Sequence, residues 1–260
     1  MVKKIRFNTV SLGSEPKNPE VEELIRFVAS FRGQETDLIR YNLIQSQTAQ
    51  FEAGISSRCV GGRFCISRVE KALHFNSEEC ILDPDDLILD AQVMVRETGS
   101  IHGALPAPHL LSGRPDFSDE ELVSDYCDGY AELIRTIRDS GVSTHILHAD
   151  RFEPIEIERL ASRKVRFFIT HAELADIELL LEHQSRVFIK SDQIPLLPGL
   201  LEQYDPKELV ILDPDEETLD LALQDIDVDR ILVGGYCSEE SEREYWRMIA
   251  DQSTLTTDQV

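Results

Sequence analysis

The sequence predicts a single α/β barrel of eight parallel strands, and three observations lead to this expectation. Short apolar runs start at residues 145, 166, 187 and 208, a spacing of 21 residues, and another follows in near register at residue 230. Each run is continuously apolar, as in strands that are buried on both faces. Helical segments alternate with the runs, as in (β/α)8 barrels. An open, doubly wound parallel sheet is the alternative.

The other elements are expected in chain order from the spacing of apolar residues, caps and turn signals. They are a strand at 4–11, helices at 20–31 and 37–53, a strand at 55–62, a small insertion at about 63–97, a strand at 100–106, a helix at 118–140 and a strand at 142–149. The insertion is expected to be either a hairpin or a strand–helix pair. Residues 1–252 are predicted to form one barrel domain, and residues 253–260 a disordered tail.

Composition narrows the possible functions. The 260 residues are 42% hydrophobic, which is enough for a full core, and the formal net charge is −23. Such an acidic chain is not expected to bind nucleic acid or an anionic membrane. The five cysteines form no Cys-x-x-Cys pair, which argues against a disulfide framework. With no signal peptide and no long apolar run, a cytoplasmic location is expected.

The residues that follow the predicted strands are the candidates for chemistry, because active sites of parallel barrels lie beyond the carboxyl ends of the strands. These residues are Asp150, His171, Asp192, Asp213 and Cys237. An aspartate there is alternatively a helix N-cap, and a buried cysteine is alternatively a small core residue. His148 is two residues before Asp150, so both are expected to face one side and to form an acid–base pair.

Four segments, in chain order, resemble the catalytic barrel of cobalamin-independent methionine synthase. They are Thr9–Glu20, Gln50–Ile55, His102–His109 and Glu121–Asp150. The first is similar to the turn that follows strand one in that family, and the last is similar to the long helix that leads into its Gln-x-Asp-Glu-Pro strand. The same superfamily contains uroporphyrinogen decarboxylase and corrinoid methyltransferases.

The resemblance implies a zinc ion, or another divalent metal, that activates a thiol for methyl transfer. Carried over residue by residue, His171 and Cys237 correspond to two of the family's ligands. Glu173 stands at the position of a ligand cysteine, and Asp192 lies just beyond the position of a ligand glutamate. Oxygen ligands of this kind weaken the preference for zinc.

The expected function is therefore that of a single-barrel methyltransferase acting on a small thiol such as homocysteine. Ser14 would help to hold the substrate, and Asp150 would hold its amine or another cationic group. The expected methyl donor is a methyl-corrinoid or a corrinoid protein. Two alternatives remain open: a metal-free, decarboxylase-like lyase that uses Asp150 and His148, and a catalytically silent barrel that binds a small molecule or a protein.

Overall fold

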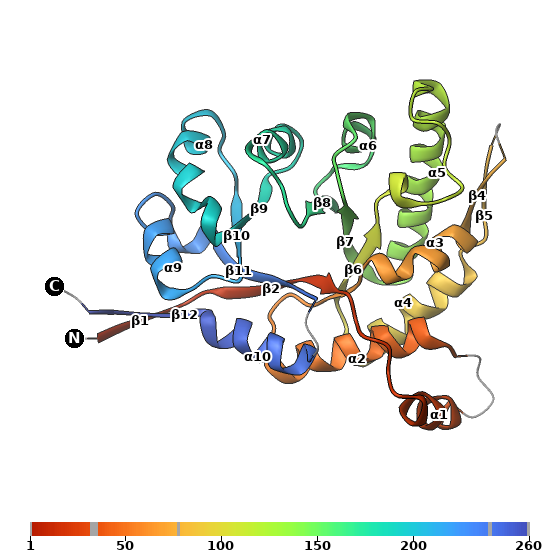
Figure 1. Cartoon of the computed structure of the whole chain (residues 1–260), viewed down its shortest axis with the longest axis horizontal. Coiled ribbons are helices and arrows are strands. Elements are labelled where there is room, and N and C mark those ends of the chain that lie inside the picture. The colour runs from red at the N-terminus through yellow and green to blue at the C-terminus, as the bar shows by residue number, and fades with distance from the viewer. Residues whose placement is uncertain (1, 32–35, 77–78, 239–240, 259–260) are drawn as a thin grey trace.

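The computed structural model describes residues 2–31, 36–76, 79–238 and 241–258, which Figure 1 shows as helices and strands. The described α-helices are α1 (Val21–Ser30), α2 (Leu38–Ala53), α3 (Ile66–Ala72), α4 (Asp85–Thr98), α5 (Glu120–Asp139), α6 (Pro154–Leu160), α7 (Leu174–His183), α8 (Leu197–Gln203), α9 (Glu216–Ala222) and α10 (Glu242–Gln252). The described strands are β1 (Val2–Arg6), β2 (Asn8–Ser14), β3 (Cys59–Gly61), β4 (Leu73–Phe75), β5 (Cys80–Leu82), β6 (Ile101–Pro106), β7 (Val142–Ala149), β8 (Val165–Ile169), β9 (Arg186–Lys190), β10 (Glu208–Leu212), β11 (Ile231–Cys237) and β12 (Thr254–Asp258).

Two parallel sheets form the centre of the α/β fold. One has the strand order β2-β11-β10-β9 and the other has the order β3-β6-β7-β8. Backbone hydrogen bonds join the sheets at β2 and β3: Ser57 N–H donates to Thr9 O, and Ser11 N–H donates to Ser57 O, both at 2.9 Å. The strands thus follow one another in chain order from β2 round to β11, as the repeat of apolar runs predicts.

Between β8 and β9 no strand pairing occurs in the described structure, and a side chain takes its place. Gln184 is buried at the end of α7. Its amide oxygen accepts from Phe167 N–H at 3.0 Å, and its amide nitrogen donates to Phe167 O at 3.4 Å and to Arg186 O at 3.0 Å. One carboxamide therefore links the backbones of the two strands.

The apolar residues form one inner core between the sheets and two outer cores under the helices. The inner core consists of Val10, Leu12, Cys59, Ala104, Ile146, Phe168, Phe188, Val210 and Leu212. The outer cores pack α3 to α6 against β3 and β6 to β8, and α7 to α10 against β9 to β11. Strands of this kind are buried on both faces, which is why their sequences are continuously apolar.

Local signals set the element boundaries. Asp37 caps α2 by accepting from Arg40 N–H at 3.0 Å, and Gly54 ends that helix with a left-handed φ of 76°. Gly61, with φ 104°, ends β3 where a Cβ atom would overlap the carbonyl oxygen of Ala104. Only glycine allows β3 and β6 to approach so closely.

One of the two alternatives for residues 63–97 is confirmed in part, and the expectation for the C-terminal tail needs revision. Residues 63–97 contain an antiparallel pair, β4 and β5, between α3 and α4, so hairpin and helices are both present. The expected disordered tail at 253–260 differs from the structure, because β12 pairs with β1 and Leu255 is buried. Residues 259–260 lie outside the described residues. Across the described chain, no helix is both long and apolar enough to span a membrane.

Candidate functional site

The residues that the sequence placed after strands do lie at the C-terminal ends of β7 to β11. Asp150 directly follows β7 and Asp213 directly follows β10, whereas Cys237 is the last residue of β11. Neither aspartate caps the next helix, because the N-cap of α6 is Glu153 and that of α9 is Asp215. Helix capping therefore does not explain Asp150 or Asp213.

His148 is buried and does not pair with Asp150. Its Nε2 donates to the carbonyl oxygen of Leu12 at 2.6 Å. The ring packs edge-on against Phe168 and Tyr236, with centroid distances of 5.5 and 4.8 Å. Burial lowers the pKa of His148 to about 4, so the ring is neutral at pH 7. These contacts make His148 part of the packing and correct the expected His148–Asp150 acid–base pair.

Asp150 instead ends a chain of three ionisable side chains. His109 Nε2 lies 2.9 Å from Asp150 Oδ1, and His109 Nδ1 lies 2.8 Å from Glu156 Oε2. The backbone N–H of His109 also donates to Glu156 Oε1 at 2.6 Å. The side chains of His109 and Glu156 are 0% exposed, whereas that of Asp150 is 48% exposed. We call these three residues the Glu-His-Asp chain.

The Glu-His-Asp chain needs more hydrogens than a neutral histidine ring supplies. Each of the two ring-to-carboxylate contacts needs a hydrogen, and a neutral imidazole carries only one. The second hydrogen must sit on the ring or on a carboxyl group. Burial raises the pKa of Glu156, and the hydrogen bonds from His109 oppose this rise. The Glu-His-Asp chain can therefore hold a proton and present it to solvent at Asp150.

Sequence reasoning missed His109 and Glu156. His109 follows β6 in a short 3-10 helix at Pro108–Leu110, a position with no strand repeat to mark it. Glu156 had a readable signal, because it is four residues before the buried Leu160 of α6 and so shares its core-facing side. An acidic residue at a core-facing position usually has a buried partner.

Ser14 does not face an open site. Its side chain is fully buried, and its hydroxyl lies 3.0 Å from that of Ser46 on α2. Gln50 extends this polar cluster by donating to Ser46 Oγ at 3.0 Å. Burial also raises the pKa of the neighbouring Glu242, and hydrogen bonds from Ser46 and Ser14 oppose the rise. Ser14 is thus a buried structural contact, which departs from the expected role in holding substrate.

The four expected metal ligands do not assemble. Cys237 is fully buried in the outer core of β9 to β11. Glu173 is the N-cap of α7 and forms a capping box with Asp176. His171 and Asp192 are exposed at the ends of neighbouring strands. Among the described residues, no group of three or more His, Cys, Asp or Glu side chains could hold a metal ion.

A cation at His171 would also meet an unfavourable charge. Lys190 Nζ lies 3.3 Å from His171 Nδ1, where it competes for the lone pair that a metal would use. An ammonium at this distance repels a divalent ion. The residues present therefore do not fit the zinc site that the resemblance implies.

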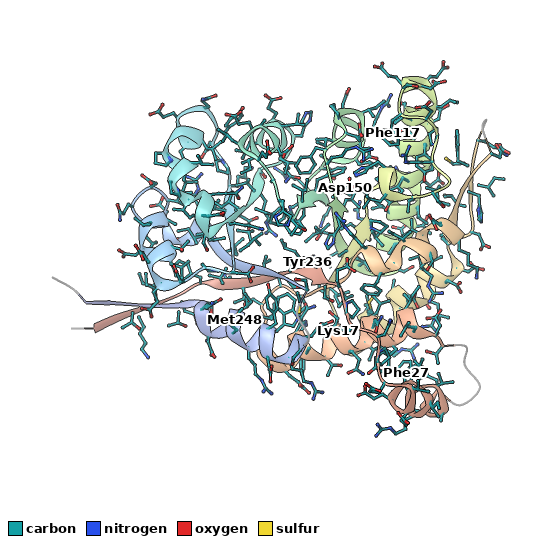
Figure 2. All side chains as sticks on the ribbon, in the orientation of Figure 1. Lys17, Phe27, Phe117, Asp150, Tyr236 and Met248 are labelled. Carbon is teal, nitrogen blue, oxygen red and sulfur yellow. The ribbon has the colours of Figure 1, made fainter. Side chains whose placement is uncertain are left out.

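A cavity of about 610 Å³ opens at the C-terminal ends of β10 and β11. It is lined by Asp213, Tyr236, Ser238, Ser241, Glu244, Tyr245 and Met248. Figure 2 shows Tyr236 near the centre of the molecule and Met248 on α10 below it. The two charged residues of this lining are both acidic, and its other polar groups are hydroxyls. The cavity therefore favours a ligand with a positive charge.

Hydrogen bonds hold the walls of this cavity. Tyr245 donates its hydroxyl to Asp213 Oδ1 at 2.6 Å, and Tyr236 donates to Glu15 Oε1 at 2.5 Å. Burial and the carboxylate partners raise the pKa of both tyrosines, so both hydroxyls stay protonated. Asp213 has a left-handed φ of 48°, a conformation that only Asn, Asp and Gly adopt readily. Its carboxylate is thus fixed in direction.

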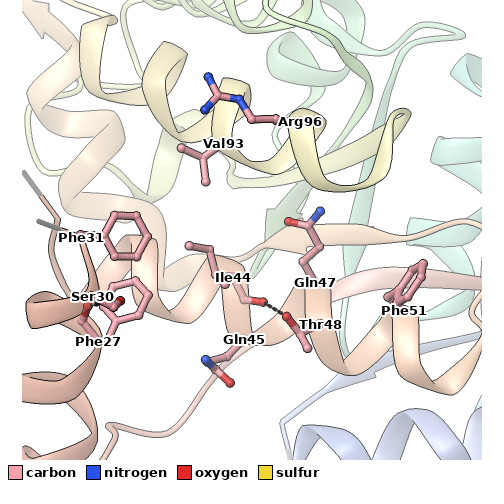
Figure 3. Close-up of a pocket in the computed structure, with 10 residues that line it drawn as sticks. All are labelled: Phe27, Ser30, Phe31, Ile44, Gln45, Gln47, Thr48, Phe51, Val93 and Arg96. Atoms are coloured by element: carbon pink, nitrogen blue, oxygen red, sulfur yellow. Dashed lines mark hydrogen bonds between the residues drawn. The ribbon is translucent and has the colours of Figure 1, made fainter. Parts of the chain in front are cut away.

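A second cavity lies away from the strand ends. The groove between α1, α2 and α4 has a volume of about 510 Å³ (Figure 3). Aromatic and aliphatic residues line much of it, including Phe27, Phe31, Ile44 and Phe51, and Arg96 is its charged residue. It lies on the helical exterior, so we do not assign it to the candidate site.

Comparisons with known proteins support the fold. No protein-family model matches the chain, and no curated protein matches it. A proposed vitamin-B12-independent methionine synthase from Listeria monocytogenes is 11% identical, with a TM-score of 0.60 over 95% of each chain. A B12-independent methionine synthase from Shewanella sp. W3-18-1, solved with selenomethionine, is 15% identical, with a TM-score of 0.59 over 96% of each chain.

A methyltransferase from Methanosarcina mazei is 10% identical, with a TM-score of 0.61, and the match covers 95% of this chain and 93% of that one. At such low identities the likeness concerns the fold. The chain is therefore an α/β protein whose structural neighbours are methionine synthase-like and methyltransferase barrels.

Proposed function

We propose that this chain is a methyltransferase-like barrel enzyme whose methyl acceptor is a small thiol that also carries an amine, as homocysteine does. The observation that carries the proposal is the cavity beside Tyr236, in which Asp213 and Glu244 supply the charge. The neighbours of methionine synthase and methyltransferase type support the reaction class. The proposal includes a barrel that closes between β8 and β9 through Gln184.

The acidic cavity is a better amine site than Asp150, which the sequence favoured. The Asp150 carboxylate is bonded to His109 and lies 3.5 Å from Arg151 Nη1. A substrate ammonium would have to compete with both. In the cavity, Asp213 accepts from the neutral hydroxyl of Tyr245, and Glu244 supplies a second carboxylate. A carboxylate beside two tyrosine rings suits an ammonium group, because the ring faces also attract cations.

The finer parts of the proposal rest on the sequence resemblance. The methyl donor is proposed to be a methyl-corrinoid, which supplies the methyl group and keeps the electron pair of the broken carbon–metal bond. The metal requirement is not carried forward, since His171 and Cys237 do not come together. The same observation favours a second candidate function, a catalytically silent barrel that binds the amine-bearing molecule without turnover.

Titration calorimetry with two matched thiols tests the binding step. L-homocysteine and 4-mercaptobutyrate differ by one amino group, so their affinities should differ by about tenfold or more if a carboxylate pairs with the amine. Asp213→Asn should remove most of this difference, because it removes the charge of the carboxylate. Asparagine keeps the left-handed backbone and the bond from Tyr245, so the cavity wall should stay in place. Asp192→Asn, at an exposed strand end, is the matched control and should change neither affinity.

Turnover separates the two candidate functions. The native chain is mixed with homocysteine and methylcobalamin, and loss of methylcobalamin absorbance is followed together with the formation of methionine. Methionine formed by the native chain and by Asp192→Asn, but reduced in Asp213→Asn, would support the enzyme. Amine-dependent binding without methionine would leave the silent barrel. Equal binding of both thiols, or of neither, would contradict both candidates.

A further inference from the structure

A layer of polar side chains lies between the sheets at the N-terminal ends of β6 to β10, opposite the cavity. Side chains alternate along a strand, so a residue two positions before an inner-core residue faces the same side. The inner core includes Ala104, Ile146, Phe168, Phe188 and Val210. The residues two positions before these are His102, Thr144, Arg166, Arg186 and Glu208. We call this set the polar layer.

The polar layer has one acidic group, and an arginine already binds it. Arg186 donates to Glu208 Oε2 from Nε and from Nη2, both at 2.6 Å. This ion pair neutralises one positive charge. The hydrogen bond from Arg186 lowers the pKa of Glu208, so this carboxylate stays charged. Glu208 is therefore largely committed to Arg186.

Two hydroxyl groups hold the His102 ring in the polar layer. Its Nδ1 lies 2.5 Å from the hydroxyl of Thr144 and 2.9 Å from that of Ser143. Burial, together with the charges of Arg186, Arg166 and Lys164, lowers the pKa of His102 to about 4. The ring is neutral at pH 7 and can take part as a hydrogen-bonding group without adding charge.

Arg166 is the arginine of the polar layer that forms no ion pair in the described part of the chain. Burial and the charge of Arg186 lower its pKa to about 10, against the opposing effect of Glu208. Its guanidinium donates no hydrogen bond to any residue in the described part of the chain. It is partly exposed, as are His102 and Arg186, so the layer is open to solvent. Arg166 and Arg186 stand two positions before Phe168 and Phe188, whose ring centroids are 5.8 Å apart. Both guanidiniums therefore face the same space beside a single acid, in a chain of net charge −23.

We propose that the polar layer is a binding site for a small oxyanion, of the phosphate or carboxylate class, held between Arg166 and Arg186 with Lys164 at its rim. A planar guanidinium fork matches the oxygens of phosphate and carboxylate. The anion would supply the charge and the acceptors that Arg166 lacks. The site lies at the opposite ends of the strands from the cavity, and it does not depend on the proposed methyl transfer.

Thermal unfolding tests this site on the full chain. Phosphate, and in a separate arm citrate, is compared with chloride at constant ionic strength. Near saturation we expect a rise in Tm of about 4 °C or more in the native chain. Arg247→Gln, an exposed arginine on α10, is the matched control and should show the same rise. Arg166→Gln should show little or none. Without the oxyanion, Arg166→Gln should unfold at a higher Tm than the native chain, because the like-charge contact is removed.

The two anion arms identify the source, since phosphate alone, citrate alone or both would each support the class. An equal rise in Arg166→Gln and in the native chain would overturn the proposal. Calorimetric titration of phosphate and citrate into the native chain keeps the test independent of whether Arg166→Gln folds. No heat of binding for either anion in that titration would also overturn the site.

Discussion

Three histidines on β6 and β7 have pKa values that burial lowers: His145 and His148 are buried, and His102 is partly buried. His145 faces the outer core, beside Gly103, and neither of its ring nitrogens has a hydrogen-bond partner in the described structure. Burial lowers its pKa to about 3. His102 and His148 have pKa values lowered to about 4. All three are therefore neutral in the folded chain at pH 7.

The pH dependence of stability follows from this neutrality. Between about pH 6.5 and pH 4 the unfolded chain binds protons that the folded chain does not, so the free energy of unfolding falls as the pH falls through this range. His145→Leu should raise that free energy by about 1 kcal/mol at pH 7, because an unpaired buried group is removed. At pH 5 the gain should grow by on the order of 1–2 kcal/mol.

Urea unfolding at pH 7 and at pH 5 measures both values. His183→Gln, on the exposed surface of α7, is the control and should leave the pH dependence unchanged. A gain from His145→Leu that is identical at the two pH values would contradict the argument.

The Glu-His-Asp chain makes a second prediction for single residues. Glu156→Gln removes the buried charge that faces His109, and we expect the free energy of unfolding to fall by about 2–3 kcal/mol. Glu158→Gln, an exposed change on the same helix, should alter it by less than about 0.5 kcal/mol. Nitrogen NMR shifts of the His109 ring would show directly whether the proton distribution changes. Equal stability of the two variants would show that the buried bond contributes little.

Between β8 and β9, one side chain replaces a strand ladder. Gln184 satisfies the N–H and carbonyl of Phe167 and the carbonyl of Arg186. These groups are the ones that a strand pairing would have satisfied. The aromatic contact between Phe168 and Phe188, with centroids 5.8 Å apart, closes the inner side of the same junction. The junction therefore depends on few interactions.

Gln184→Leu should weaken this junction selectively. The apolar replacement leaves the Phe167 N–H without its partner, and we expect the free energy of unfolding to fall by about 2 kcal/mol. Hydrogen exchange at the Phe167 amide should become faster, whereas amides in the paired strands β10 and β11 should change little. Glu182→Gln, exposed on the same helix, serves as the control. Unchanged exchange at Phe167 would argue against a bridging role.

At the scale of the whole molecule, the two ends of the chain are paired. Ile5 of β1 lies opposite Leu255 of β12, and the two termini lie together at one end of the molecule (Figure 1). Leu255 is buried against the outer core of β9 to β11. The β1–β12 pair therefore fastens the last helix, α10, to the start of the first sheet.

Removal of residues 254–260 should destabilise the chain. Exposure of the site that Leu255 fills and loss of the ladder should together lower the free energy of unfolding by about 2–3 kcal/mol. Chemical unfolding followed by circular dichroism measures this value. A shorter deletion, of residues 259–260 alone, is the control and should cost little. A full deletion that behaves like the short one would show that the tail is dispensable.

Much of the fold could be predicted because a strand that is buried on both faces needs a continuous run of apolar residues, and such runs repeat here at a fixed spacing. Predicted strands at 100–106 and 142–149, and the helix ending before Gly54, correspond closely to β6, β7 and α2. The position of Asp150, Asp213 and Cys237 at strand ends was predicted for the same reason. The tail at 254–258 could not be, because its strand depends on a partner at the other end of the chain.

The sequence by itself determined the α/β class, the order of the strands and the edge at which to look for chemistry, since these follow from local periodicity and from chain order. Only the tertiary structure decided which polar side chains meet. Cys237 is buried in the outer core, His171 contacts Lys190, and Asp150 forms a hydrogen bond with His109. Such pairings depend on side-chain direction and on residues distant in sequence, and spacing along the chain carries neither.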